Sequence, residues 1–344
     1  MLVRQSLLNV AEGLEASRLK SVLEQSQEEL AVAETELLSS LMEAYLTALL
    51  ADADLEQYEA ELKSLESQLR EANALYERSL LPVTQVLETQ TRADTLRADV
   101  IMARGNSLIA REEVSQLTGQ EVDELVEVKE TFTLISRFKS AYQAAQAASL
   151  NSPAVAAAEA AVDAARKGVD GAKASWLPTV DLTYSFQHSD VGFDNMQSPA
   201  RDTSTVAVGF EYPLFSGGAR IARVRGAKAK FNSADTMFRA EVTRAEARAR
   251  SAWLSLQAIE ERLVAAKKSV VSSRTNLDAS RKAVSAGTAR VSDVLIALSQ
   301  NTTALRDYSQ AKFQYAMAWV ELEMATGSDP SHIASVVSRA IHGK

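Results

Sequence analysis

The sequence predicts a mainly α-helical fold of long antiparallel coiled-coil helices, interrupted by one short β-hairpin. Three observations predict it: the chain repeats itself at a fixed offset, its two longest segments carry heptad patterns without proline, and one segment alternates with the period of a strand. With 13 Gly and 6 Pro in 344 residues, the chain has few residues that would interrupt helices.

The internal repeat has an offset of 208 residues and holds without gaps across both arms of a helical hairpin. Matching pairs are Ala44/Ala252, Leu46/Leu254, Leu69/Leu277, Val86/Val294, Thr95/Thr303, Asp99/Asp307, Ala103/Ala311, Ala110/Ala318, Glu113/Glu321 and Gly119/Gly327. Self-similarity at a fixed spacing is typical of stacked or symmetrically paired units. We therefore expect two equivalent hairpins.

The first long helix is expected from about Ala11 to Ser79, a span with no proline and the single glycine Gly13. A helix of that length measures about 100 Å. Its distal half has apolar residues at alternating spacings of three and four: Leu55, Tyr58, Leu62, Leu65, Leu69, Ala72 and Tyr76. The second repeat keeps this register with smaller residues: Leu263, Ala266, Val270, Ser273, Leu277, Ser280 and Val284. Both patterns predict coiled-coil packing.

Each long helix ends in a short interruption, 79–83 or 286–290, and a returning helix follows, about 84–117 or 292–325. Both returning helices close with Thr-Gly, a C-cap signal. The expected organisation is a partial first-repeat β-strand (1–10), a first helical hairpin with its tip near 79–84 (11–120), a less regular equatorial segment (121–152), a helix (153–175), a β-hairpin (176–215), a second helical hairpin with its tip near 286–292 (216–327) and a C-terminal tail (328–344).

The segment after Pro178 breaks the helical pattern. Apolar residues alternate with small or polar ones, first at Val180, Leu182, Tyr184 and Phe186, then at Val206, Val208, Phe210, Tyr212 and Leu214. We expect two strands joined by a polar loop from His188 to Asp202. The hairpin either packs on a soluble core or spans a membrane as barrel strands, which need about 9–11 residues with an apolar outer face. The aromatic residues near the strand ends, Trp176 and Tyr212, favour a membrane interface.

Composition excludes several classes of protein. The net charge of −8 and the lack of clustered Lys or Arg argue against nucleic-acid binding, and without cysteine there are no disulfides or thiolate metal sites. The three histidines are not spaced as ligands, and no phosphate-loop motif follows Gly217-Gly218. We therefore expect neither an enzyme nor a metal or cofactor site.

Four motifs resemble those of TolC-type outer membrane factors. The run Tyr212-Pro-Leu-Phe-Ser-Gly-Gly-Ala219 is similar to the strand-to-helix motif of that family, and Trp176-Leu-Pro-Thr-Val-Asp-Leu-Thr183 to the entry into the preceding strand. The runs Ser285–Leu295 and Ser79–Val86 resemble its two periplasmic tips. The resemblance covers essentially the whole chain, including its duplication.

The resemblance implies a homotrimer whose protomers contribute strands to one transmembrane β-barrel and helices to a periplasmic α-barrel with a tapered end. Such proteins are passive exit ducts, recruited by a periplasmic adaptor (membrane fusion) protein and an inner membrane transporter of the ABC or RND type. We thus expect an outer membrane location, in contact with its lipid, with a periplasmic extension. A signal peptide and about half of the first repeat are absent relative to the family pattern, so we expect the sequence to be a fragment.

By the same resemblance, the adaptor would contact the tips at Leu80, Leu81, Val83, Thr84, Gly287, Thr288 and Ser292. The alternative is that these are turn residues of a helix reversal. Asp293 would form a ring of three carboxylates at the periplasmic entrance; alternatively it is a first-turn acid favoured by the helix dipole.

We expect the cargo to be protein, exported by type I secretion, with drugs or other small molecules of an efflux system as the alternative. The alternative from another class is a soluble or surface-attached coiled-coil scaffold that uses the β-hairpin as a docking element.

Overall fold

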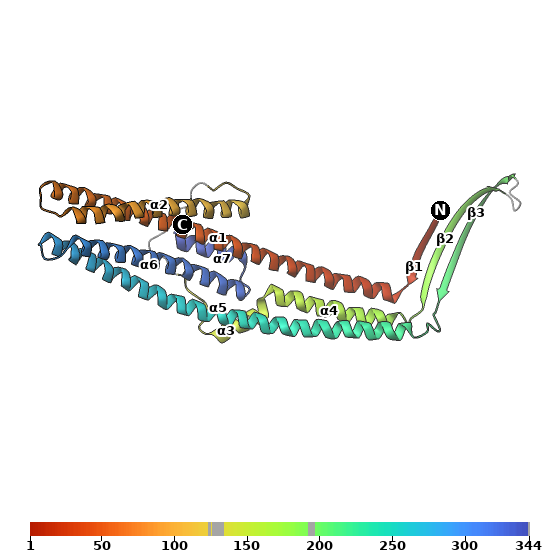
Figure 1. Ribbon diagram of the computed structural model, residues 1–344. Coiled ribbons are helices and arrows are strands. Elements are labelled where there is room, and N and C mark those ends of the chain that lie inside the picture. The colour runs from red at the N-terminus through yellow and green to blue at the C-terminus, as the bar shows by residue number, and fades with distance from the viewer. Residues whose placement is uncertain (123–124, 126–133, 192–196, 343–344) are drawn as a thin grey trace. The chain divides into compact units, whose positions relative to one another are not determined.

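The computed structural model describes residues 1–122, 125, 134–191 and 197–342. They form two units: Met1–Val32 with Pro153–Arg244, and Ala33–Ser152 with Ala245–Lys344. Part of the segment 121–152, predicted to be less regular, lies outside the described residues. Figure 1 shows the chain order of the helices and strands. None of the described helices is both long and apolar enough to cross a membrane.

The first unit contains a three-stranded antiparallel sheet in the order β1 (Leu2–Leu8), β2 (Thr179–Val191) and β3 (Gln197–Glu211). The polar loop predicted for 188–202 is wrong in extent, because His188 and Asp202 are paired within the strands. Their polar side chains remain exposed while the backbone continues the ladder, so polarity alone did not mark the end of a strand.

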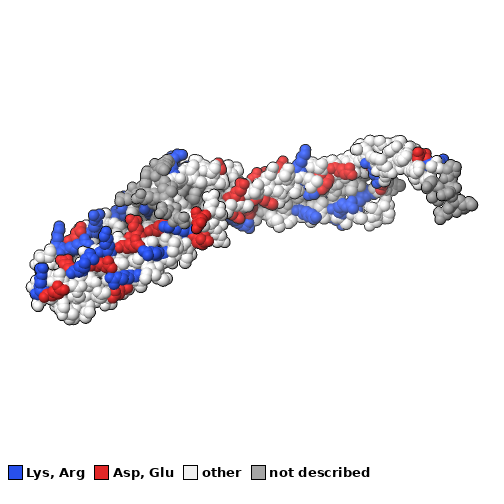
Figure 2. Space-filling model, turned by 90° about the horizontal axis from the view of Figure 1, so that it is seen from above, with Lys and Arg blue, Asp and Glu red and all other residues white. Residues whose placement is uncertain are grey.

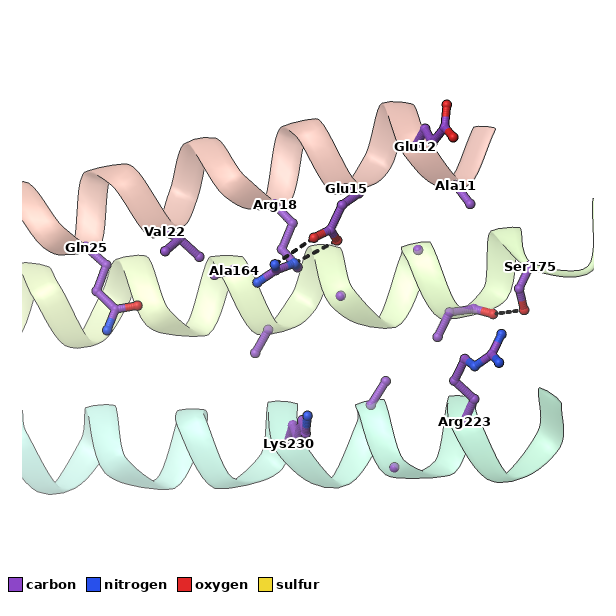
Figure 3. Close-up of a pocket in the computed structure, with 16 residues that line it drawn as sticks. Ala11, Glu12, Glu15, Arg18, Val22, Gln25, Ala164, Ser175, Arg223 and Lys230 are labelled. Atoms are coloured by element: carbon purple, nitrogen blue, oxygen red, sulfur yellow. Dashed lines mark hydrogen bonds and ion pairs between the residues drawn. The ribbon is translucent and has the colours of Figure 1, made fainter. Parts of the chain in front are cut away.

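Three helical segments follow from this sheet: the start of α1 (Val10–Glu77), all of α4 (Pro153–Ala174) and the start of α5 (Ala219–Ser285). The helix α4 lies between the other two (Figures 1 and 3). It consists mainly of alanine and valine, and both residue types are buried along it, for example Val162, Ala164 and Val169. Small side chains allow neighbouring helices to approach closely on both sides.

The second unit contains two helical hairpins. In the first, the distal part of α1 packs on α2 (Val83–Thr118) through Leu65, Leu69, Val86 and Leu96. In the second, α5 packs on α6 (Val291–Ala325) through residues that include Leu277, Val294 and Leu298. Buried and half-buried residues follow the predicted heptads, except at Tyr76, which is 47% exposed near the end of α1. The prediction of a mainly α-helical, coiled-coil fold is confirmed.

Two further helices lie where the sequence analysis expected irregular chain or a tail. The helix α3 (Ala141–Asn151) lies within 121–152, and α7 (Pro330–His342) lies within 328–344. In α7, Ile333, Val337 and Ile341 are buried at intervals of four residues. That spacing is the amphipathic signal of a helix, and it explains why this end of the chain is packed.

Candidate channel surfaces

One face of the sheet is mainly apolar, with Gln5 (opposite Leu182) and Ser204 (opposite Phe186) as polar members. Because residues opposite each other in a ladder point to the same side, the register groups Val3, Leu8, Val180, Leu182, Tyr184, Phe186, Val206, Val208 and Phe210. Val206, Val208 and Phe210 are each more than two-thirds exposed. The other face carries Asp181, Thr183, Ser185, Gln187, Thr203 and Thr205. The visible part of the sheet bears few charged side chains, whereas acids and bases are interspersed over the coiled-coil hairpins (Figure 2).

Polar pairs and aromatic residues border this apolar face. At one end, His188 Nδ1 lies 2.5 Å from Asp202 Oδ1 on the same face, beyond Phe186. At the other end, the predicted interface residues Trp176 and Tyr212 flank the strands and are 46% and 49% exposed. The buried Arg220 stacks on the Trp176 ring at 5.1 Å and donates a hydrogen bond to the Pro213 carbonyl. Arg220 therefore fixes the start of α5 against both connections to the sheet.

The two hairpin tips share one backbone design. At the first tip, Ser79 has a φ of 60°, and the Leu80 N–H donates to the Leu75 carbonyl. At the second, Gly287 has a φ of 70°, and the Thr288 N–H donates to the Ala283 carbonyl. These are the left-handed residue and the six-to-one hydrogen bond of a Schellman motif. The repeat thus extends to the turn geometry, with serine in place of glycine at the first tip.

The predicted tip residues divide into an exposed and a packed group. Leu80 and Val83 are 69% and 45% exposed, and Thr84, Gly287 and Thr288 are exposed as well. Leu81 instead packs on the apolar core between α1 and α2. Ser292 is half-buried and lines a groove between α2 and α6. Both residues have their side chains turned toward the protein, away from the apex of the hairpins.

Asp293 is exposed and lies in the first turn of α6. Its Oδ2 accepts a hydrogen bond of 3.0 Å from the backbone N–H of Arg290. A first-turn acid that accepts from the chain before the helix satisfies an otherwise unpaired donor and interacts favourably with the helix dipole. The structure therefore gives Asp293 a structural role in the second tip.

A polar seam on α1, which the sequence analysis missed, faces the second hairpin. Its members follow a heptad beside the apolar one: Asp54, Gln57, Glu61, Ser64 and Gln68. Gln57 Nε2 donates to Ser309 Oγ at 2.9 Å, and Arg306 of α6 stacks on the Tyr58 ring at 4.4 Å. The sequence signal for this seam is a second heptad of polar residues beside the apolar one, and apolar periodicity alone does not reveal it.

Glu61 is the most buried acid of this seam, with 7% of its surface exposed. Burial raises the pKa of the Glu61 carboxyl, while Thr302, Arg92 and Arg306 oppose the increase by favouring the charged form. Asp99 adds to the increase by repulsion. Burial also raises the pKa of Asp54, against the attraction of Arg306. The two hairpins are thus joined by acids that are costly to ionise.

Comparison with known proteins gives a match to a family model described as outer membrane efflux protein, over residues 17–120 and 144–328. The matched residues include both helical hairpins and the sheet strands β2 and β3.

Among relatives, the alkaline protease secretion protein AprF of Pseudomonas aeruginosa is 29% identical over 313 residues, which cover 90% of this chain and 65% of AprF. The outer membrane protein TolC of Vibrio cholerae is 23% identical, over 88% of this chain and 70% of TolC. The chain thus spans less than two thirds of the length of AprF. Among solved structures, VceC of Vibrio cholerae has a TM-score of 0.77 at 18% identity, over 95% of this chain and 78% of VceC, which shows a shared fold.

Proposed function

We propose that this chain, which belongs to the outer membrane efflux protein family and resembles TolC-type outer membrane factors, acts as one protomer of a homotrimeric passive exit duct. As a member of that family it is an outer membrane protein with a periplasmic extension. The observation that carries the proposal is the sheet, with its exposed apolar face, its polar opposite face and its two free edges.

The free edges are the reason to propose several copies. Within the described residues, β1 and β3 each pair on one side only, with β2. In lipid, an unpaired strand edge leaves backbone N–H and C=O groups without partners, at several kcal/mol each. Closing the sheets of several protomers into one barrel pairs every edge, with the apolar face toward lipid and the polar face toward the lumen.

The hairpin tips are the proposed contact for a periplasmic adaptor, which would in turn connect the duct to an inner membrane ABC or RND-type transporter. The exposed Leu80, Val83, Thr84, Gly287 and Thr288 form the contact surface that we favour, because their side chains or backbone are accessible at the apex. Leu81 and Ser292 would act indirectly, by holding the tips on the groove between the hairpins.

We propose type I protein secretion as the activity, supported by the similarity to AprF, whose name describes secretion of a protease. Efflux of small molecules is the second candidate, supported by the description of the family. Expression of the full-length gene in a strain that lacks its own outer membrane factors distinguishes them. Restored export of a protease supports secretion, whereas restored drug resistance alone supports efflux.

Planar-bilayer conductance tests the duct and the role of Asp293. Asp293→Asn removes the charge but keeps an oxygen that can accept from Arg290. The matched control is Glu321→Gln, an exposed acid far along α6. We expect a cation-selective conductance that multivalent cations block, with the block weakened in Asp293→Asn and unchanged in Glu321→Gln. If multivalent cations block both variants equally, Asp293 does not act at the entrance. If the protein shows no conductance, the result contradicts the proposed duct and favours a coiled-coil scaffold.

A further inference from the structure

A cavity of about 900 Å³ in the first unit is bordered by three helices, α1, α4 and α5 (Figure 3). Its floor is α4, which contributes only alanine, glycine and serine there, for example Ala164, Gly168 and Gly171. Its walls are α1 and α5, which contribute the charged residues Glu12, Glu15, Arg18, Arg223 and Lys230. The cavity therefore combines a floor without long side chains and walls that carry charge.

The wall formed by α1 offers no free carboxylate to the cavity floor. Arg18 donates two hydrogen bonds to the Glu15 carboxylate, at 2.7 and 2.8 Å, and these bonds lower the pKa of Glu15. The Arg18 side chain lies over the floor, since a Cβ built on Gly168 would be 3.6 Å from Arg18 Cδ. Figure 3 shows the Glu12 side chain directed away from α4. The acids of α1 are thus either paired or turned outward.

The wall formed by α5 carries two unpaired cations. Among the described residues, the side chains of Arg223 and Lys230 have neither an ion pair nor a hydrogen bond. At the repeat offset of 208 residues, Arg223 corresponds to Glu15 and Lys230 to Val22, which both line the facing wall. The acid equivalent to Arg223 is therefore used by Arg18 on its own helix, and the positive charge of α5 stays without a partner.

The neighbouring charges leave this end of α5 positive. Residues 219–234 of α5 include five basic residues and no acid. Outside the cavity, α4 pairs its own charges, with Asp163 at 3.3 Å from Arg166 and Asp170 at 2.8 Å from Lys173. A cleft bordered by unpaired charge of one sign attracts groups of the opposite sign. The cavity is therefore suited to anionic groups.

The hollow side of this layer is the side that a ring of helices turns inward. In a ring, each helix lies outside the line that joins its two neighbours, so three adjacent helices form a hollow on their inner face. The cavity has this arrangement, with the middle helix α4 as its floor and α1 and α5 as its walls. In the proposed duct the cavity would open toward the lumen, through which the cargo passes.

We propose that this cavity binds acidic segments of the exported polypeptide through Arg223 and Lys230. This inference rests on the proposed secretion duct. Seven helical residues separate the two cations by about 10 Å along α5, and an extended chain covers that distance in about three residues. The small side chains of the floor leave room for the backbone of such a segment. Ion pairs with exposed cations are weak and screened by salt, so the cargo is also released.

Matched variants of α5 test the site. Arg223→Gln with Lys230→Gln removes both cavity cations. Arg225→Gln with Lys228→Gln is the control, because it removes the same charge from residues that lie about 200° around the helix and do not line the cavity. Fluorescence anisotropy with labelled hexaglutamate measures binding to the full-length protein in detergent. We expect an affinity about tenfold lower in the cavity variant, an unchanged affinity in the control, and no binding of hexalysine.

The outcomes separate this site from the duct itself. Hexaglutamate should reduce the bilayer conductance of the wild type and the control variant, and reduce that of the cavity variant less. Equal affinity in the wild type and the cavity variant overturns the site, and so does an equal loss in the control. Binding without an effect on conductance overturns it too, because the cavity then lies outside the lumen. Binding that depends on Arg223 and Lys230 in a protein without conductance supports an acidic-peptide site and contradicts the duct.

Discussion

Gly119 and Gly327 occupy equivalent positions after the two returning helices, and their alanine variants test how α3 is held. Their φ angles are 67° and 74°, a region that strains any residue with a Cβ. A Cβ at Gly119 would meet nothing within 4 Å. A Cβ at Gly327 would lie 2.2 Å from the carbonyl oxygen of Asn151, the last residue of α3, and 2.5 Å from its carbonyl carbon. Gly119→Ala thus changes backbone strain alone, and Gly327→Ala adds a clash.

The magnitudes follow from these two terms. A left-handed conformation costs a residue with a Cβ about 1–2 kcal/mol, partly offset by the lower entropy of the unfolded chain, so we expect Gly119→Ala to cost about 1 kcal/mol. The clash at Gly327 involves backbone atoms, which cannot rotate away as a side chain could. Overpacking of this kind costs about 1–3 kcal/mol more. We expect Gly327→Ala to lower the free energy of unfolding by about 2–4 kcal/mol.

Thermal unfolding followed by circular dichroism, in one detergent and at one protein concentration, compares the variants. We expect the Tm of Gly327→Ala to fall well below that of Gly119→Ala, and hydrogen exchange to increase in α3 only for Gly327→Ala. Equal losses of Tm in the two variants would refute the reasoning, because they would show that α3 does not approach Gly327 closely. A loss confined to Gly119→Ala would refute it as well.

Three further predictions concern the second unit. Ser79→Gly should raise the free energy of unfolding by about 1 kcal/mol, because glycine adopts a positive φ without strain. Gly287→Ser should lower the free energy of unfolding by a similar amount. A drop in the Tm of Ser79→Gly would contradict the assignment of a Schellman motif to the first tip. Because the pKa of Glu61 is raised in the folded protein, stability should be greatest below the ordinary glutamate pKa and fall as pH rises through the raised value. Glu61→Gln should therefore raise the Tm at neutral pH and reduce the dependence of Tm on pH, and an unchanged pH profile would exclude Glu61 as its source. Arg137→Ala should cost about 1 kcal/mol in chemical unfolding. Arg137 Nε lies 3.3 Å from Glu323, which is 3% exposed, but the Arg137 side chain is 54% exposed and Glu323 still accepts a hydrogen bond from Ser328. Glu323→Gln should recover part of that loss, and no recovery would show that the charge is not the cause.

The sequence was sufficient to predict the fold class because long heptads and a fixed repeat are strong local signals. Tyr58, Leu65 and Leu69 contribute to the core at the register that their spacing predicts. The extent of the strands was not predictable from polarity, since His188 and Asp202 continue a ladder with exposed side chains. The α7 helix was missed because it is short, although the spacing of Ile333 and Val337 was a readable signal.

The candidate site was predicted less completely, because surface roles depend on which side of a helix each residue occupies. Leu80 and Leu81 are neighbours in sequence, but one is exposed at the apex and the other packs on the core. Asp293 was identified as a first-turn acid, and its hydrogen bond to Arg290 confirms that local role and tests no other. The contacts of Glu61 join two hairpins that are distant in sequence, so no local pattern could have paired them.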